Sequence, residues 1–229
     1  MSSQVTNAQI AVRFGISFTI IAVVLFGSAG TIFWPEAWLY IFVHLGCAFF
    51  MTAWMKLHDP SLLKKRTELN IAAAESWDRK LLLLMIILFI PYLIILGLDA
   101  VRFGWSDVPL EAQIGAMALL SGSLWITFRA MQENSFASPI VELQADRGHK
   151  VIDTGPYAHV RHPMYSGVIL FLFALPVWLG SLWGLPMAAV ISAVFLFRIF
   201  AEERLLRVNL DGYKAYTERV RYRLFPKLW

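Results

Sequence analysis

Six apolar runs dominate the sequence, and each is long enough to cross or nearly cross a bilayer hydrocarbon core of about 30 Å. They cover residues 14–33, 38–55, 81–98, 112–128, 165–182 and 185–197. Inside a bilayer the chain must satisfy its own backbone hydrogen bonds, and a continuous apolar run does so as a helix. The last two runs are short and joined by GSLWG, which indicates a tight helical hairpin. The pattern predicts an all-α membrane protein with about six transmembrane helices.

Composition also favours a membrane protein. Hydrophobic residues make up 58% of the 229 positions and charged residues only 16%, whereas a soluble domain has about half apolar and about a quarter charged residues. The single cysteine, Cys47, excludes a disulfide framework and indicates a buried thiol. The net charge of +4 would suit nucleic-acid binding, but the distribution of the charges argues against that function.

The basic residues fall almost entirely on one side of the predicted spans. Six crossings place both termini on the same side, together with nineteen of the 20 Lys and Arg residues. The exception, Arg102, shares the other side with Glu36, Asp99, Asp107 and Glu111. The positive-inside rule makes the basic side cytoplasmic. We therefore expect an integral membrane protein with cytoplasmic termini, whose basic face contacts membrane lipids and not nucleic acid.

Residues 1–130 are interpreted as a four-span membrane region. The first run ends in GSAGT, which is similar to a signal-peptidase site, but Arg13 is the only basic residue before it, so we expect a retained span. Loop 56–80 carries Asp59 and Pro60 ahead of a Lys-rich stretch. A cap and a first-turn proline predict an amphipathic surface helix that anchors at the interface.

Ionisable and aromatic side chains gather just before the fifth apolar run. The segment GPYAHVRHPMYSG brings together Tyr157, His159, Arg161, His162 and Tyr165. Pro163 disfavours a helical conformation at His162 and suits the first turn of a helix, so the fifth span begins here. The N–H groups and positive dipole end of that helix suit a carboxylate or phosphate. Gly167, one turn later, would let another backbone or a ligand come close. A simple headgroup belt is the alternative interpretation.

A second polar group of residues closes the last apolar run. In FRIFAEERLL, Arg198 and Glu202 are four residues apart, so they share a helix face and can pair, while Glu203 lies on a neighbouring face. The alternative is an arginine that merely extends to the interface. The tail GYKAYTERVRYRLFP is amphipathic and predicts an interfacial helix packed over the site.

Together these motifs carry a family resemblance. GPYAHVRHPMYSG, AEERLL and YKAYTERVRYRLFP resemble, over about residues 132–226, the integral-membrane methyltransferases that include isoprenylcysteine carboxyl methyltransferase and phospholipid N-methyltransferases. The resemblance implies that 131–229 is a catalytic region with S-adenosylmethionine as cofactor. It also implies catalytic roles for Glu202 and for Arg198, which takes the position of a substrate-contacting arginine. The implied cofactor-binding residues are Gln144, His149, Lys150, Val151, Ile152, Tyr157, His162, Pro163, Met164, Tyr165 and Glu202.

The residue types fit this chemistry independently of the resemblance. A helix N-terminus suits the cofactor's carboxylate, an acidic group such as Glu202 suits its ammonium, and tyrosine faces suit its sulfonium and adenine. Methyl transfer is an in-line displacement that needs no metal, so positioning supplies most of the acceleration. The hypothesis is therefore methyl transfer, in a cytoplasmic-face site, to a lipophilic acceptor such as a prenyl or lipid compound that enters from the bilayer.

Two other functions stay open at this point. Sterol reductases have a similar RHPxY run and would use NADPH, although their cofactor phosphates call for more basic residues than Arg147 and Lys150. A transporter or scaffold would bind no cofactor and would leave the cluster 157–165 without a role. A transporter also places polar groups near mid-membrane, where this chain offers only His44, Ser121 and Ser123. The acceptor atom and the choice between Glu202 and Glu203 are undetermined.

Overall fold

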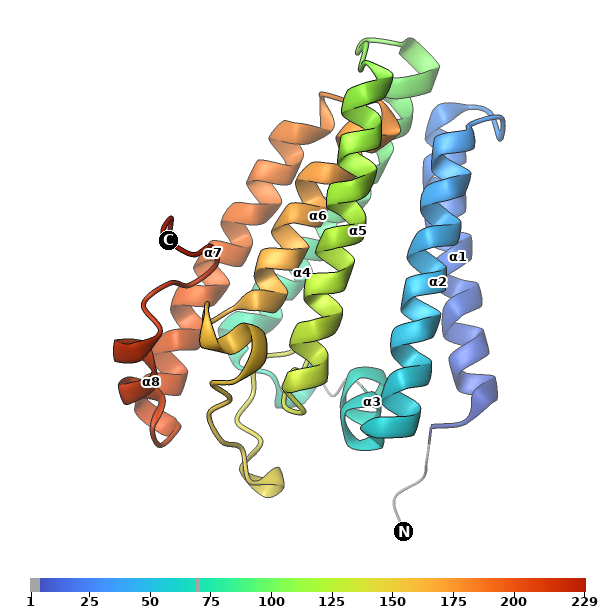
Figure 1. Cartoon of the computed structure of the whole chain (residues 1–229). Helices are drawn as coiled ribbons and strands as arrows, with labels where there is room; N and C mark the ends of the chain where they lie inside the picture. The colour runs from blue at the N-terminus through green and yellow to red at the C-terminus, as the bar shows by residue number, and fades with distance from the viewer. Residues whose placement is uncertain (1–4, 69–70) are drawn as a thin grey trace.

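Helices are the only regular secondary structure in the part of the chain that the structure describes. The computed structural model describes residues 5–68 and 71–229, and within these ranges it contains no strand (Figure 1). The α-helices are α1 (Asn7–Ala29), α2 (Pro35–His58), α3 (Pro60–Thr67), α4 (Ser76–Gly97), α5 (Leu110–Glu133), α6 (Pro163–Leu179), α7 (Gly184–Asn209) and α8 (Tyr213–Arg219). Short 3₁₀ or π turns are η1 (Ile71–Ala73), η2 (Leu98–Phe103), η3 (Ala145–Arg147) and η4 (Gly155–Ala158). The predicted all-α fold is confirmed.

Five helices in the described ranges are long and apolar enough to cross a membrane. They are α1, α2, α4 together with η2, α5 and α7. The chain is therefore an integral membrane protein. The apolar helix α6 has only 17 residues, so a sixth crossing stays a prediction. Helix α7 continues to Asn209, beyond the apolar run that ends at Phe197. The expected helical conformation at Arg198 and Glu202 is thus confirmed, and the stretch AEERLLR consists largely of strong helix formers.

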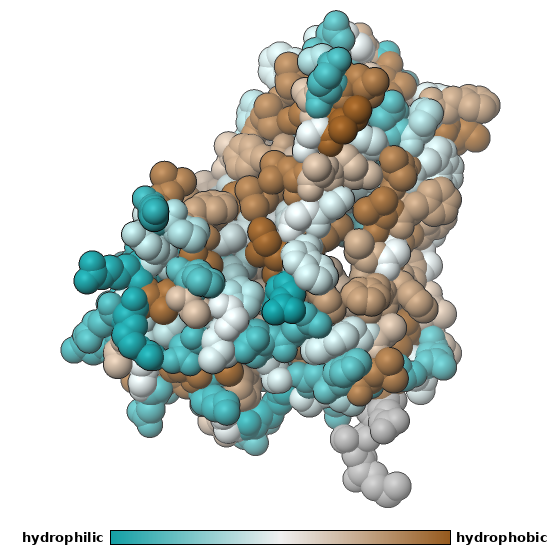
Figure 2. Space-filling view, viewed as in Figure 1, coloured by the Kyte–Doolittle hydropathy of each residue, from teal (hydrophilic) through white to brown (hydrophobic). Residues whose placement is uncertain are grey.

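One end of the helical bundle is polar. Figure 1 shows α3, α8 and the long connection 134–162 at the same end of the molecule. Figure 2 shows hydrophilic residues gathered over this end, whereas the helical body above it is mostly hydrophobic. The two long connections and the tail, which carry most of the basic residues, therefore share one end.

Helices α5 and α6 approach closely because Gly167 has no side chain. A Cβ at this position would lie 2.7 Å from the backbone oxygen of Ser123 and would also clash with Thr127 Oγ1. Gly167 therefore admits the backbone of α5, which is one of the two roles expected for it. On the other side of α6, Tyr92 Oη donates to the Leu172 carbonyl of α6 at 2.8 Å. These contacts fix α6, and hence its first turn, against the bundle.

Loop 56–80 forms a shorter surface helix than expected. The cap is confirmed, since the Asp59 side chain accepts from Leu62 N and Pro60 occupies the first turn. However, α3 ends at Thr67, and α4 begins already at Ser76; residues 69–70 of the expected helix lie outside the described residues. Leu62 is fully buried, so α3 packs against the protein and does not present a whole face to the interface.

Candidate functional site

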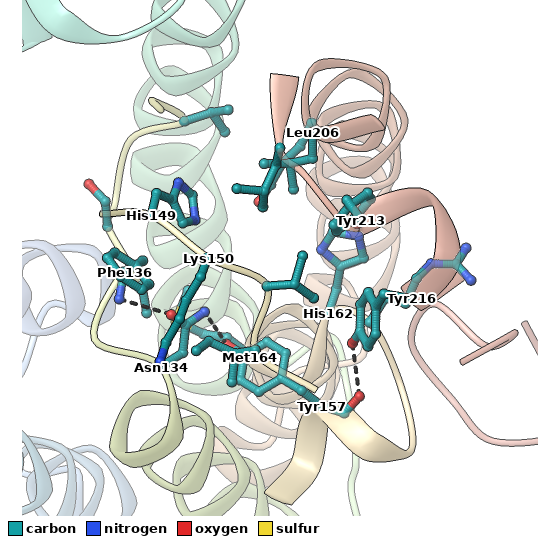
Figure 3. A pocket seen from close by; sticks show the side chains of 18 of the residues that line it. Asn134, Phe136, His149, Lys150, Tyr157, His162, Met164, Leu206, Tyr213 and Tyr216 are labelled. Carbon is teal, nitrogen blue, oxygen red and sulfur yellow. Dashed lines mark hydrogen bonds between the residues drawn. The ribbon is translucent and has the colours of Figure 1, made fainter. Parts of the chain in front are cut away.

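A pocket opens at the polar end of the bundle, and we call it the polar pocket. All residues that line it lie between positions 134 and 216 (Figure 3). The sequence-predicted cofactor residues that line it are His149, Lys150, Val151, Ile152, Tyr157, His162, Met164, Tyr165 and Glu202. Two stretches far apart in the sequence therefore meet here: the connection after α5 with the start of α6, and the end of α7 with α8. Figure 3 shows His149 and Lys150 on one side and Tyr213 and Tyr216 of α8 on the other.

The first turn of α6 borders the polar pocket. His162 has non-helical backbone angles (φ −127°, ψ 60°), and Pro163 is the first residue of the helix, as expected. Within the described residues the His162 side chain makes no capping bond to this helix. The next two residues, Met164 and Tyr165, line the pocket. Their N–H groups belong to the first turn of α6, where no carbonyl of the same helix is available to accept a hydrogen bond from them. This end of α6 therefore suits an anionic group.

The two neighbouring glutamates of α7 have different surroundings. Glu202 lines the polar pocket and accepts a hydrogen bond from Tyr165 Oη at 2.7 Å. Glu203 is only 4% exposed and accepts from Arg161 Nε at 2.6 Å and from Arg223 Nε at 3.1 Å. Glu202 thus keeps a carboxylate at the pocket, whereas Glu203 is an internal anchor.

Arg161 fastens the C-terminal tail to the segment that precedes α6. Its guanidinium donates to the carbonyls of Val220 and Arg221 at 2.7 and 2.9 Å. Its backbone N donates to Tyr222 O at 2.9 Å, and His162 N donates to Arg223 O at 2.8 Å. Residues 220–223 of the tail are therefore bonded to the segment that precedes α6. Only α8, a helix of seven residues, represents the interfacial helix expected over 212–226.

Aromatic rings supply much of the pocket wall. Tyr157 is buried, Asn134 Nδ2 donates to its Oη at 3.2 Å, and burial raises its pKa to about 12. Burial also raises the pKa values of Tyr213 and Tyr216. These phenols therefore stay neutral at physiological pH. Tyr216 Oη donates to the Tyr157 carbonyl at 2.8 Å (Figure 3). Opposite them, His149 packs on Phe136 with ring centroids 4.7 Å apart, and burial lowers the pKa of His149.

Three predicted site residues do not line the polar pocket. Gln144 is buried, donates to Phe136 O at 3.0 Å and accepts from Arg147 Nη1, so it shapes the loop behind the pocket. Pro163 is buried at the start of α6. Arg198 bonds to Asp78, with Nε 2.7 Å from Oδ1 and Nη2 3.1 Å from Oδ2. The expected pairing of Arg198 with Glu202 is therefore wrong, because a carboxylate from α4 occupies the guanidinium.

Several pocket residues were not predicted from the sequence. They are Asn134, Phe136, Leu206, Leu210, Tyr213 and Tyr216, among others. Tyr213 and Tyr216 are three residues apart and therefore share a helix face, which is a signal that the tail contained. Asn134 and Phe136 lie in an irregular loop and carry no local signal. Predicting Leu206 and Leu210 as pocket residues would have required knowing where α7 ends.

A second, apolar cavity lies between the helices and is open at its edge, where Ile20, Ile86 and Ile90 are exposed; we call it the deep cavity. Its volume is about 550 Å³, against about 110 Å³ for the polar pocket. Residues from α1, α2, α4, α5, α6 and α7 line it, including Ile20, His44, Phe89, Leu124, Val168 and Phe195. Phe195 contacts Tyr165 of the polar pocket, with ring centroids 5.6 Å apart. The two cavities are therefore separated at this point by one pair of aromatic rings.

Comparison with known proteins identifies related sequences for the C-terminal part of the chain. Residues 112–210 match the family described as phospholipid methyltransferase. A segment of 63 residues is 32% identical to Protein-S-isoprenylcysteine O-methyltransferase B of Arabidopsis thaliana. That segment covers 28% of this chain and 30% of the relative's length. The predicted resemblance to this group of membrane methyltransferases is confirmed.

Proposed function

We propose that this integral membrane protein, which is related through its segment 112–210 to the phospholipid methyltransferase family, transfers a methyl group from S-adenosylmethionine to a lipophilic acceptor. The observation that carries the proposal is the convergence of Tyr157, His162 and Glu202 on one pocket. Tyr157 and His162 come from the connection before α6 and Glu202 comes from α7, so two distant stretches of the chain bring groups with chemical counterparts in the cofactor to one place.

The polar pocket fits the cofactor group by group. Glu202 would hold the ammonium, the first turn of α6 would hold the carboxylate, and the tyrosine faces would hold the adenine and the sulfonium. One buried atom supports a polar ligand directly: Tyr213 lines the pocket, and its Oη has no hydrogen-bond partner among the described residues. A buried hydroxyl without a partner is costly, and a bound ligand would satisfy it. When bound, the cofactor supplies an electrophilic methyl group.

The acceptor is inferred to be a lipophile that enters from the bilayer. The deep cavity is lined almost wholly by apolar side chains of membrane-crossing helices and reaches Phe195, which contacts Tyr165. An acyl or prenyl chain would lie in this cavity, and its reactive end would then reach the ring pair at the polar pocket. The excess of Lys and Arg on the loops of this end supports a cytoplasmic site.

Calorimetric titration of the detergent-solubilised full chain with S-adenosylhomocysteine tests the proposal. We expect binding by the wild type and an affinity about 10 to 100 times lower for Glu202→Gln, because a charge-assisted contact is lost. Glu218→Gln on the exposed part of α8 is the matched control and should bind normally. No affinity in folded wild-type protein, or binding of NADPH in its place, would overturn the proposal.

A second experiment identifies the acceptor class. Protein in nanodiscs is incubated with methyl-labelled S-adenosylmethionine and a total membrane lipid extract. We expect label in an organic-soluble product, and mass spectrometry of that product gives the acceptor. Label that stays wholly in water-soluble compounds would contradict a lipophilic acceptor while leaving cofactor binding intact.

A further inference from the structure

A closed ion pair lies behind the wall of the polar pocket. Arg198 is 5% exposed and Asp78 is 0% exposed. The guanidinium donates from Nε to Asp78 Oδ1 at 2.7 Å and from Nη2 to Oδ2 at 3.1 Å. Nη2 also donates to the Pro139 carbonyl at 2.7 Å. This two-point geometry is the one in which arginine binds a carboxylate ligand, and here a side chain of the protein already fills it.

The same pair holds part of the pocket wall. Asp78 Oδ2 accepts from Val141 N at 2.7 Å, and the Val141 carbonyl accepts from Glu75 N at 3.2 Å. The segment 139–141 is thus bonded to both members of the pair, and Val141 and Ile140 line the polar pocket. Asp78 is therefore in a position to affect the site through Arg198 and through this wall.

Arg198 is placed at the junction of the two cavities. On α7 it lies one turn after Phe195 of the deep cavity and one turn before Glu202 of the polar pocket. The centre of its guanidinium is 5.6 Å from the centroid of the Tyr165 ring. That ring contacts Phe195, and its hydroxyl bonds Glu202. The reactive end of a lipophilic acceptor would have to arrive here to meet the methyl donor.

We propose that Asp78 is a specificity-determining residue: by occupying Arg198 it makes the site select an acceptor with an uncharged nucleophile over one with a carboxylate. This inference rests on the proposed function. An acceptor carboxylate would have to displace Asp78 from Arg198 and leave a buried carboxylate with only the N–H of Val141 and without its cationic partner, which is strongly unfavourable. It would also approach the carboxylate of Glu202, and like charges repel. An uncharged nucleophile, such as an amine in its neutral form, meets neither obstacle.

The transfer balances for an uncharged nucleophile. The lone pair of the acceptor atom forms the new bond to the methyl carbon as the carbon–sulfur bond breaks, and the electrons of that bond remain on sulfur. The sulfonium becomes a neutral thioether, and the positive charge passes to the acceptor atom. An amine acceptor then releases a proton to water.

The test compares two probes of equal chain length, dodecanoate and dodecanol, by titration against the full chain in nanodiscs with S-adenosylhomocysteine present. The wild type should bind dodecanol at least as tightly as dodecanoate. Asp78→Asn, which exposes the charge of Arg198, should bind dodecanoate at least tenfold more tightly than the wild type does. A general loss of structure would weaken both probes and would not reverse their order. A wild type that binds dodecanoate ten times more tightly than dodecanol would overturn the proposal.

A neutral double variant covers the case in which Asp78→Asn fails to fold. Asp78→Asn with Arg198→Gln removes both charges, and its amides can restore hydrogen bonds across the pair. It should fold, bind S-adenosylhomocysteine and keep the wild-type preference for dodecanol. If the double variant gains affinity for dodecanoate, the preference does not depend on the occupied arginine and the proposal fails. Absence of S-adenosylhomocysteine binding in the wild type would instead count against the proposed function. The preference between dodecanol and dodecanoate does not test that function.

Discussion

The polar pocket and the deep cavity meet at Tyr165 and Phe195, but different forces hold them together. The polar pocket depends on directional bonds between distant segments, as when Arg161 binds both Glu203 and the tail carbonyls. The deep cavity is bounded by apolar side chains from six helices, and packing alone shapes it. Loss of one directional bond in a buried network costs much free energy, whereas packed apolar side chains can rearrange around a substitution. The pocket should therefore respond sharply to substitution and the cavity gradually.

The largest expected effect tests whether the polar pocket responds sharply to substitution. Glu203→Ala leaves the buried guanidinium of Arg161, and that of Arg223, without their carboxylate. Removing one member of a buried ion pair destabilises a protein by about 3–5 kcal/mol, so we expect a loss of that size in chemical denaturation. Binding of S-adenosylhomocysteine should fall more than tenfold, because Arg161, which lines the pocket, loses the carboxylate that holds it in place.

Glu218→Gln provides the control for this variant, because that glutamate is exposed on α8. It should change the free energy of unfolding by less than about 0.5 kcal/mol. If Glu203→Ala were as stable as Glu218→Gln, the bonds to the tail would contribute little, and the sharp response expected of the pocket would be refuted.

The next effect concerns the packing of α5 against α6. Gly167→Ala places a methyl group 2.7 Å from Ser123 O, where α5 and α6 touch. Overpacking of this kind costs about 1–3 kcal/mol, and it should appear as a lower midpoint of thermal unfolding. Gly122→Ala is the control, since a methyl group there would meet no described atom within 4 Å apart from its chain neighbours and the nearby backbone of α5. Equal midpoints for the two variants would show that the helix contact is looser than the geometry indicates.

A smaller and selective effect is expected in the deep cavity. Val168→Trp projects a larger side chain from α6 into a space that Val168 lines. The cavity should lose room for about two methylene groups, worth about 0.8 kcal/mol each, so the KM for a long-chain acceptor should rise about tenfold. Steady-state kinetics with acceptors of different chain length measures this. Short acceptors and S-adenosylhomocysteine affinity should be unaffected, and a loss of cofactor affinity would contradict the separation of the two cavities.

The same division explains what could be predicted from the sequence. Local backbone rules located the start of α6 at Pro163 and the cap at Asp59, because proline geometry and capping act within a few residues. Most of the cofactor-binding residues that the family resemblance implied also line the polar pocket. The bond between Asp78 and Arg198 joins residues 120 positions apart, and no local pattern indicates it. The deep cavity could not be predicted from the sequence for a similar reason: its lining residues have the same apolar character as residues that face lipid.

The smallest predicted effect concerns acid and the loop that carries His149. Because burial lowers the pKa of His149 in the folded protein, the unfolded chain takes up a proton first, near pH 6.5. In that window the unfolded state binds more protons, so stability falls as the pH drops below about 6.5 and levels off below the folded pKa. His149→Phe keeps a ring against Phe136 and should make the decline in thermal midpoint between pH 7.5 and 5.5 shallower. Tyr157→Phe should leave that decline unchanged, because the pKa of Tyr157 is raised to about 12 and the phenol is neutral in both states. Equal slopes for wild type and His149→Phe would mean that protonating His149 costs nothing in the folded pocket, and the pocket would then tolerate a charge as readily as the deep cavity tolerates a change of volume.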